Sequence, residues 1–206
     1  MSTRVYDCLK LIAEKIIENK DFLTDLDREI GDADHGVNMA RGFQAVIEKV
    51  DPEDADIGNA LKKTGMTLLS TVGGASGPLY GTAYMEAAKI FAGKTEVNGD
   101  DFKAALDAAI AGIQKRGHAE KGEKTMLDAL MPATDTFAEK LAGGASLVDA
   151  LTDACVAANE GIEFTKTIAA TKGRASYLGD RSIGHQDPGA TSLTMTLETI
   201  RDFLKS

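Results

Sequence analysis

Carboxylate side chains gather in one short stretch of the sequence, where five Asp or Glu residues and one Arg occur within ten positions from Asp25 to Asp34. Hard oxygen ligands close to glycines, where helices turn, suit Mg²⁺. An EF-hand does not fit, because the fifth and twelfth positions counted from Asp32 are a glycine and a phenylalanine. The charge count alone leaves a solvated acidic turn open, since two carboxylates about 6 Å apart repel by roughly 0.7 kcal/mol in water. The candidate metal ligands are Asp27, Asp32 and Asp34.

A glycine-rich stretch, Val72 to Pro78, leads into a predicted helix. The backbone N–H groups and the dipole at a helix start can face a phosphate, and glycines permit close approach. The stretch lacks the Walker lysine and is not a G-x-G-x-x-G motif. A flexible turn or close helix packing is therefore an equally good interpretation of this segment alone.

Two further segments are polar and lie between predicted helices. The first, 115–124, carries four Lys or Arg against two Glu, and we expect a solvated charged loop there. The second, 172–189, contains four glycines, and long loops of this kind are often lids or binding loops. We expect an ordered lid instead of disorder, because Tyr177, Leu178 and Ile183 could anchor it to the body of the protein.

The elements that must position these segments are helices, because apolar residues recur at three- and four-residue spacing and sustained strand-like alternation is missing. We predict one all-α domain over residues 1–206 with about eight helices. Asp100 should cap the fifth helix, Ser146 with Asp149 forms a capping-box pattern, and Asp187 precedes a proline-assisted helix start. The apolar series lie within 5–16, 39–50, 57–68, 84–91, 102–113, 127–141, 147–158 and 193–204.

Composition excludes several classes of protein. A net charge of −9, a pI near 4.9 and the lack of Trp argue against a nucleic-acid-binding surface. Charged residues interrupt the apolar stretches, so we expect no membrane span and a cytoplasmic location. Cys8 and Cys155 lie among apolar residues and have no metal-ligand spacing, which favours reduced, buried thiols.

The four polar segments together resemble the ADP-binding L subunits of bacterial dihydroxyacetone kinases, and the similarity extends from about Phe22 to the last helix. The resemblance rests on 26–36, 64–70, 72–78, 172–179 and 181–191. It implies an antiparallel barrel of eight helices with the nucleotide site in loops at one end. It also implies two Mg²⁺ ions on the three aspartates named above.

The same resemblance implies which residues surround ADP or ATP. They are His35, Gly36, Val37, Asn38, Ala75, Ser76, Gly117, Met126, Arg174, Asp187, Pro188 and Gly189. Phosphoryl transfer requires positioning and neutralisation of charge, and an arginine can stabilise the migrating group. Arg174 is the candidate for that catalytic role.

In the bacterial dihydroxyacetone kinases that the sequence resembles, catalysis needs partner subunits. A K subunit binds dihydroxyacetone, and an M phosphocarrier, driven by phosphoenolpyruvate, rephosphorylates ADP on the L subunit. The sequence leaves a homodimer open.

Two alternative functions remain: a nucleotide-sensing regulator without catalysis, and an L-type domain of an ATP-dependent ketose or fatty acid kinase. The Ala-Asp-His stretch that ends at His35 disfavours the fatty acid kinase.

Overall fold

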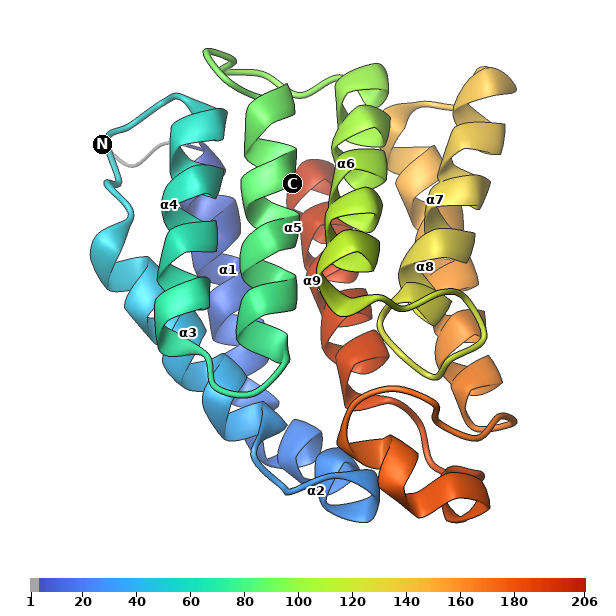
Figure 1. Ribbon diagram of the computed structural model, residues 1–206. Helices are drawn as coiled ribbons and strands as arrows, with labels where there is room; N and C mark the ends of the chain where they lie inside the picture. The colour runs from blue at the N-terminus through green and yellow to red at the C-terminus, as the bar shows by residue number, and fades with distance from the viewer. Residues whose placement is uncertain (1–3) are drawn as a thin grey trace.

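The apolar series fold into helices throughout the computed structural model, which describes residues 4–206 (Figure 1). Within that range there are nine α-helices, one 3₁₀-helix and no strand, so the predicted all-α class is confirmed. The helices are α1 (Arg4–Glu18), α2 (Lys20–Ile30), α3 (His35–Lys49), α4 (Ile57–Thr71), α5 (Ser76–Ile90), α6 (Gly99–Gly117), α7 (Leu127–Ala142), α8 (Leu147–Thr165), η1 (Arg174–Ser182) and α9 (Pro188–Lys205).

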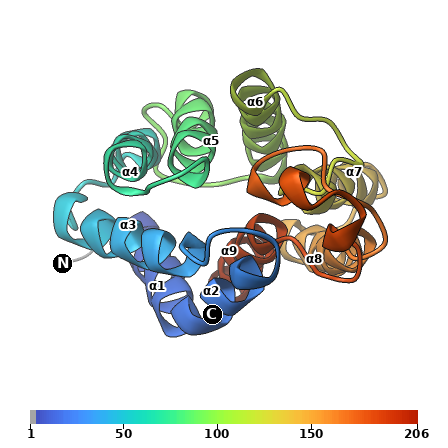
Figure 2. The same ribbon diagram turned by 60° about the horizontal axis from the view of Figure 1, so that its bottom comes forward.

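Eight of the α-helices form a closed ring, visible when the molecule is viewed from its loop end (Figure 2). Each helix packs against the next in the order α1, α3, α4, α5, α6, α7, α8 and α9, and α9 packs again on α1. The apolar stripes face inward and bury one large core, in which the Phe102 and Phe137 rings lie 5.3 Å apart between α6 and α7. This ring corresponds to the barrel that the sequence led us to expect.

The helix that sequence analysis missed is α2, which includes half of the acidic segment. Leu23, Asp27 and Ile30 lie on its buried face, while Asp25, Arg28 and Glu29 are exposed. The acidic segment is therefore a loop only from Gly31 to Asp34. Because α2 stands outside the ring and also contacts α9 and η1, it helps to close the lower end of the barrel (Figure 1).

Side-chain caps fix the starts of α4, α6, α8 and α9, and of these only α9 begins at the end that carries the polar segments. Asp187 Oδ2 accepts a hydrogen bond from the Ala190 N–H at 2.7 Å, so the predicted start of α9 is confirmed. Ser146 caps α8 in the same way through the Asp149 N–H. The prediction for Asp100 is wrong, because Asn98 caps α6 by accepting from the Asp101 N–H at 2.8 Å, which leaves Asp100 inside the first turn.

The four polar segments meet at one end of the barrel (Figure 1). The chain runs up and down between the two ends, so the connections before α3, α5, α7 and α9 all lie at the lower end. The connections before α4, α6 and α8 lie at the opposite end. Over the described range, no helix is long and apolar enough to cross a membrane.

Candidate nucleotide and metal site

The acidic cluster joins the last turn of α2 to the first turn of α3. Carboxylate oxygens of Asp27, Asp32 and Asp34 lie within 4.8 Å of one another. Asp27 is 9% exposed and also shapes the turn, because its Oδ2 accepts hydrogen bonds from the backbone N–H groups of Asp34 at 2.8 Å and His35 at 3.1 Å. The three side chains form a cluster of hard oxygen donors, the kind of ligand that Mg²⁺ prefers.

Two backbone features of this turn bring the carboxylates together. Ala33 has φ 58°, in the left-handed region, which costs a residue other than glycine about 1 kcal/mol. A Cβ at Gly31 would overlap the Asp27 carboxylate, so only glycine lets the chain pass that close to it. Strain of this kind is common at ligand-binding sites.

The charges around the cluster are only partly compensated. Arg174 Nε lies 2.6 Å from Asp32 Oδ2, and the arginine side chain is 68% exposed. Burial raises the pKa of Asp34, and the neighbouring Asp32 carboxylate raises it further. A cation bound among the three carboxylates would remove this repulsion.

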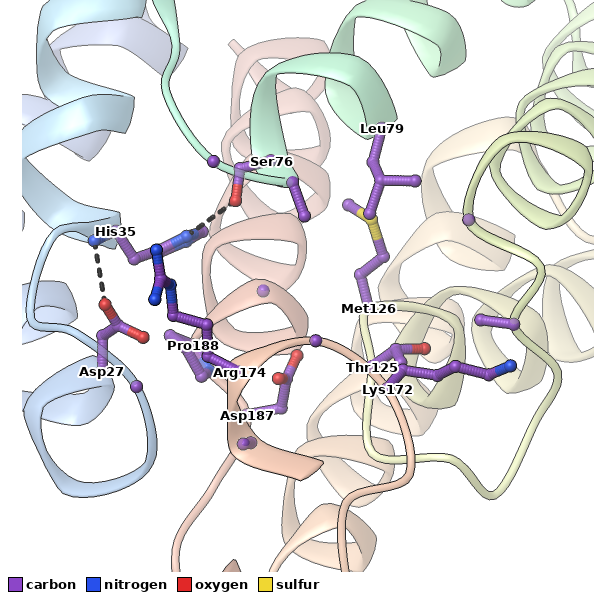
Figure 3. A pocket seen from close by; sticks show the side chains of 18 of the residues that line it. Asp27, His35, Ser76, Leu79, Thr125, Met126, Lys172, Arg174, Asp187 and Pro188 are labelled. Atoms are coloured by element: carbon purple, nitrogen blue, oxygen red, sulfur yellow. Dashed lines mark hydrogen bonds between the residues drawn. The ribbon is translucent and has the colours of Figure 1, made fainter. Parts of the chain in front are cut away.

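A buried histidine connects the acidic turn to the glycine-rich turn (Figure 3). His35 Nδ1 lies 3.0 Å from Ser76 Oγ, and its Nε2 lies 2.9 Å from Ser192 Oγ. Ser192 Oγ is in turn 2.6 Å from the hydroxyl of Tyr80. Burial lowers the pKa of His35 to about 4, so the ring is neutral at pH 7. His35 therefore holds the starts of α3 and α5 and the first turn of α9 in register.

A cavity of about 440 Å³ opens between these elements. Its wall includes most of the residues predicted for the site: Asp27, Asp32, Asp34, His35, Ala75, Ser76, Gly117, Met126, Arg174, Asp187, Pro188 and Gly189. Three predicted residues lie beside the cavity and do not line it. Gly36 packs against α2, Val37 is 47% exposed, and buried Asn38 accepts a hydrogen bond from Arg41 at 2.7 Å.

The cavity is asymmetric in chemistry. One side is apolar, formed by Leu79, Ile113 and Met126. Three helices also begin at the cavity, α3 at His35, α5 at Ser76 and α9 at Pro188, and helix N-termini favour anions. An anion-attracting wall beside a tricarboxylate cluster suits a ligand with an apolar part and a phosphate chain that carries cations.

The predicted lid is an ordered segment, but its anchor is polar. Ser182 is fully buried, and its Oγ accepts from the Ala170 N–H at 2.8 Å. The Gly184 N–H donates to the Lys166 carbonyl at 2.8 Å. Anchoring by Tyr177 and Ile183 was a wrong expectation, since these side chains are 84% and 45% exposed. Lys172 to Ala175, at the start of the segment, line the cavity.

Sequence analysis also missed residues of the cavity wall. Thr125, Lys172, Tyr80 and Lys124 line it, and Lys124 is only 2% exposed although it belongs to the segment expected to be a solvated loop. Tyr80 lies two residues after the 72–78 segment, and Lys172 is the first residue of the 172–179 segment. Their positions in the sequence could therefore have indicated that they belong to the site. Lys124 has no such signal, because its partners are backbone carbonyls far away in the sequence.

Residues 29–202 match the model of the DAK2 domain family, so the chain belongs to that family. It is similar to the ADP-binding subunit of the PEP-dependent dihydroxyacetone kinase of Escherichia coli (strain K12), with 44% identity over 199 residues, 96% of this chain and 95% of that protein. It is also 34% identical to the human triokinase/FMN cyclase over 207 residues, which cover only 36% of that protein. The resemblance predicted from the sequence is thus confirmed.

A solved structure supports the same grouping. The dihydroxyacetone kinase of C. freundii in complex with AMP-PNP and Mg²⁺ superimposes with a TM-score of 0.73 at 25% identity. The match covers 96% of this chain and 33% of the larger one. The helical barrel found here therefore also occurs as part of the longer chain of that kinase.

Proposed function

We propose that this chain is the ADP-binding subunit of a PEP-dependent dihydroxyacetone kinase. The observation that carries the proposal is the meeting, in one cavity, of a tricarboxylate cluster, three helix N-termini and an apolar wall. The similarity to the Escherichia coli subunit over nearly the whole of both chains supports the choice of substrate class. The reaction is transfer of a phosphoryl group from nucleotide to ketone.

Each part of the cavity has a task in this proposal. Asp27, Asp32 and Asp34 would hold two Mg²⁺ ions, which would neutralise the charge of the phosphates. Ala75 and Ser76, at the start of α5, face the phosphates with backbone N–H groups. The apolar wall, which includes Met126 and also Leu79 next to Gly117, takes the base.

Arg174 is the residue that we assign to the transferred group. Its guanidinium is exposed beside the cavity and close to Asp32, where it can stabilise the phosphoryl group that passes from ATP to a substrate outside the cavity and leaves ADP behind. The cavity contains the acidic and cationic groups that phosphoryl transfer needs. The ketone comes from a K subunit docked at this end, and an M phosphocarrier subunit regenerates ATP in place.

The test is a product time course with purified components. The chain and its K partner should give no more than a single turnover with ATP, because a lid that slows ADP release makes the nucleotide a resident coenzyme. Adding the M protein and a phosphoenolpyruvate-driven carrier system should restore steady catalysis. Radiolabelled ADP should stay on the chain throughout.

Three outcomes would count against the proposal. Sustained turnover on ATP with rapid exchange of labelled ADP would assign the chain to the ATP-dependent kinases. Binding of Mg–ADP without any product, with the cognate K and M proteins present, would favour a nucleotide sensor. Unchanged ADP affinity in EDTA would remove the metal from the site.

A further inference from the structure

Lys124 is a buried lysine in the cavity wall, and a lysine in such a place suggests a phosphate ligand. Its side chain makes a different set of contacts. The Nζ atom donates hydrogen bonds to the carbonyl oxygens of Thr165, Ile168 and His185, and the Ile168 bond measures 3.4 Å. An ammonium has three N–H donors, so these carbonyls use all of them. Lys124 therefore cannot bind phosphate without giving up a protein partner.

The three carbonyls belong to two segments of the lower end, the end of α8 with the turn after it and the loop before α9. Thr165 ends α8, Ile168 lies in the turn that leads to the cavity-lining residues 172–175, and His185 lies just before the cap of α9. A cation at the C-terminus of α8 also meets the negative end of the helix dipole. One ammonium thus joins three polypeptide segments, and we call this arrangement the Lys124 junction.

Further hydrogen bonds connect the same segments around the junction. The Asp187 N–H donates to Thr165 Oγ1 at 3.0 Å, and the Thr171 N–H donates to the Glu123 carbonyl at 3.3 Å. The Gly184 N–H bond to Lys166 joins the last two segments directly. These bonds fix how the segments that carry Arg174 and Asp187 stand relative to the segment that carries Met126.

The backbone around Lys124 is itself held in an uncommon conformation. Lys124 has φ 61°, which disfavours residues with a Cβ by about 1–2 kcal/mol. Asp128 is 1% exposed, and its carboxylate accepts hydrogen bonds from the backbone N–H groups of Gly122 and Thr125, which lie before and after Lys124 in the sequence. The chain thus keeps a strained lysine where glycine would suit the backbone, which indicates that the ammonium is needed.

We propose that Lys124 is a positioning residue for nucleotide binding. It acts through the Lys124 junction, which places Met126 on one side of the cavity and Arg174 and Asp187 on the other. The inference rests on the proposed function, because the ligand that these walls enclose is Mg–ADP. It assigns to Lys124 a role that is separate from contact with the nucleotide.

The test compares Lys124→Met with Lys121→Met, which removes an exposed lysine from the same loop. Binding of Mg–ADP is measured by calorimetry at a temperature where circular dichroism shows that both variants are folded. The dissociation constant of Lys124→Met should be about 10-fold higher than that of the wild type, or more, as is usual when a supporting contact is lost. Lys121→Met should match the wild type. A lysine that only stabilised the fold would lower Tm and leave the dissociation constant of the folded protein unchanged, and that result would overturn the proposal.

Hydrogen exchange separates this inference from the proposed function. In the ADP-free proteins, the amides of Asp187, Gly184 and Thr171 should exchange faster in Lys124→Met and not in Lys121→Met. A wild-type protein that does not bind Mg–ADP would refute the function, while the exchange comparison would still decide whether Lys124 positions the loops. Equal exchange in both variants would contradict the Lys124 junction.

If Lys124→Met does not fold, the wild-type protein gives the answer by NMR of lysine ammonium groups. A buried ammonium with three partners should exchange slowly with water and give a resolved signal. Because coupling between two sites is reciprocal, Mg–ADP should slow this exchange further. A signal that does not respond to Mg–ADP, or no protected ammonium, would show that Lys124 is not coupled to the nucleotide.

Discussion

Replacing Asp34 by Asn should have opposite effects without and with Mg²⁺. The carboxylate oxygens of Asp34 and its two acidic neighbours lie within 4.8 Å of one another. Two charges at that separation repel by about 0.9 kcal/mol in water and about 3.5 kcal/mol at an effective dielectric near 20. Asp34 is half-buried, and Arg174 offsets part of the charge on Asp32. We therefore expect Asp34→Asn to stabilise the metal-free protein by about 1–2 kcal/mol.

With Mg²⁺ present, the wild-type protein should be more stable than Asp34→Asn. A ligand that binds only the folded state at 100 times its dissociation constant adds about 2.7 kcal/mol to the free energy of unfolding. The wild-type protein has three anionic ligands for this gain, and Asp34→Asn keeps two. Asn is also a good residue at a helix N-cap, the position that Asp34 occupies before α3, so the substitution should not weaken the helix start.

Urea denaturation of both proteins in EDTA and in Mg²⁺ measures the four free energies of unfolding. Asp25→Asn is the matched control, because Asp25 is an exposed residue of α2 outside the cluster. This control should respond to Mg²⁺ like the wild type. Equal stabilities of wild type and Asp34→Asn in EDTA would mean that the carboxylates form an ordinary solvated turn. An unchanged Mg²⁺ response would remove Asp34 from the metal ligands.

Three further predictions concern residues around the cavity and the core. Burial raises the pKa of Asp187 from 3.8 to about 7, so the folded protein loses stability as pH rises from about 4 to 7, the range in which only the unfolded chain ionises this carboxyl. Asp187→Asn should therefore gain about 2 kcal/mol between pH 5 and pH 8.5 relative to wild type, by urea denaturation at both values, and a constant difference would refute this. Gly161→Ala should lower stability by about 1–2 kcal/mol despite its better helix propensity, because the new Cβ would overlap the Asp128 carbonyl of α7. Gly143→Ala, with its nearest atom at 3.4 Å, should change Tm little, and equal Tm values for the two variants would show that α7 and α8 can separate at no cost. Arg174→Ala should keep ADP affinity but slow single-turnover phosphoryl transfer about 10³-fold or more, whereas normal turnover would exclude Arg174 from the mechanism.

Periodicity predicted the helices because each has one apolar face that must be buried, and the family resemblance implied their arrangement in a barrel. The same rule applies to α2, where Leu23 and Ile30 lie seven residues apart on the buried face. Sequence analysis gave more weight to the charges from Asp25 onward and placed a loop there. Asp25, Arg28 and Glu29 lie on the solvent side of α2, so the apolar spacing was the better guide.

The glycine and aspartate motifs predicted which segments matter but not how they meet. Asp27, Asp32 and Asp34 are close in the sequence, and their grouping could be anticipated. The approach of Ser76 and Ser192 to His35 could not, because Ser192 is 157 residues away and its hydroxyl is one of many on α9. Only the up-and-down chain path, which places the starts of α3, α5 and α9 at one end, makes these contacts possible.

Lys124 marks the limit of what a sequence pattern can predict about this cavity. Its carbonyl partners include Thr165 and His185, which are 41 and 61 residues away. Every residue has a carbonyl, so the identity of such a partner leaves no signature in the sequence. The charge of the 115–124 segment predicted solvation, and Lys121 in that segment is indeed exposed. What distinguishes the two lysines is the fold, because the end of α8, the turn after it and the loop before α9 bring three carbonyl oxygens around the Lys124 ammonium. A lysine there satisfies all three at once, and in doing so it sets the distance between the walls of the site.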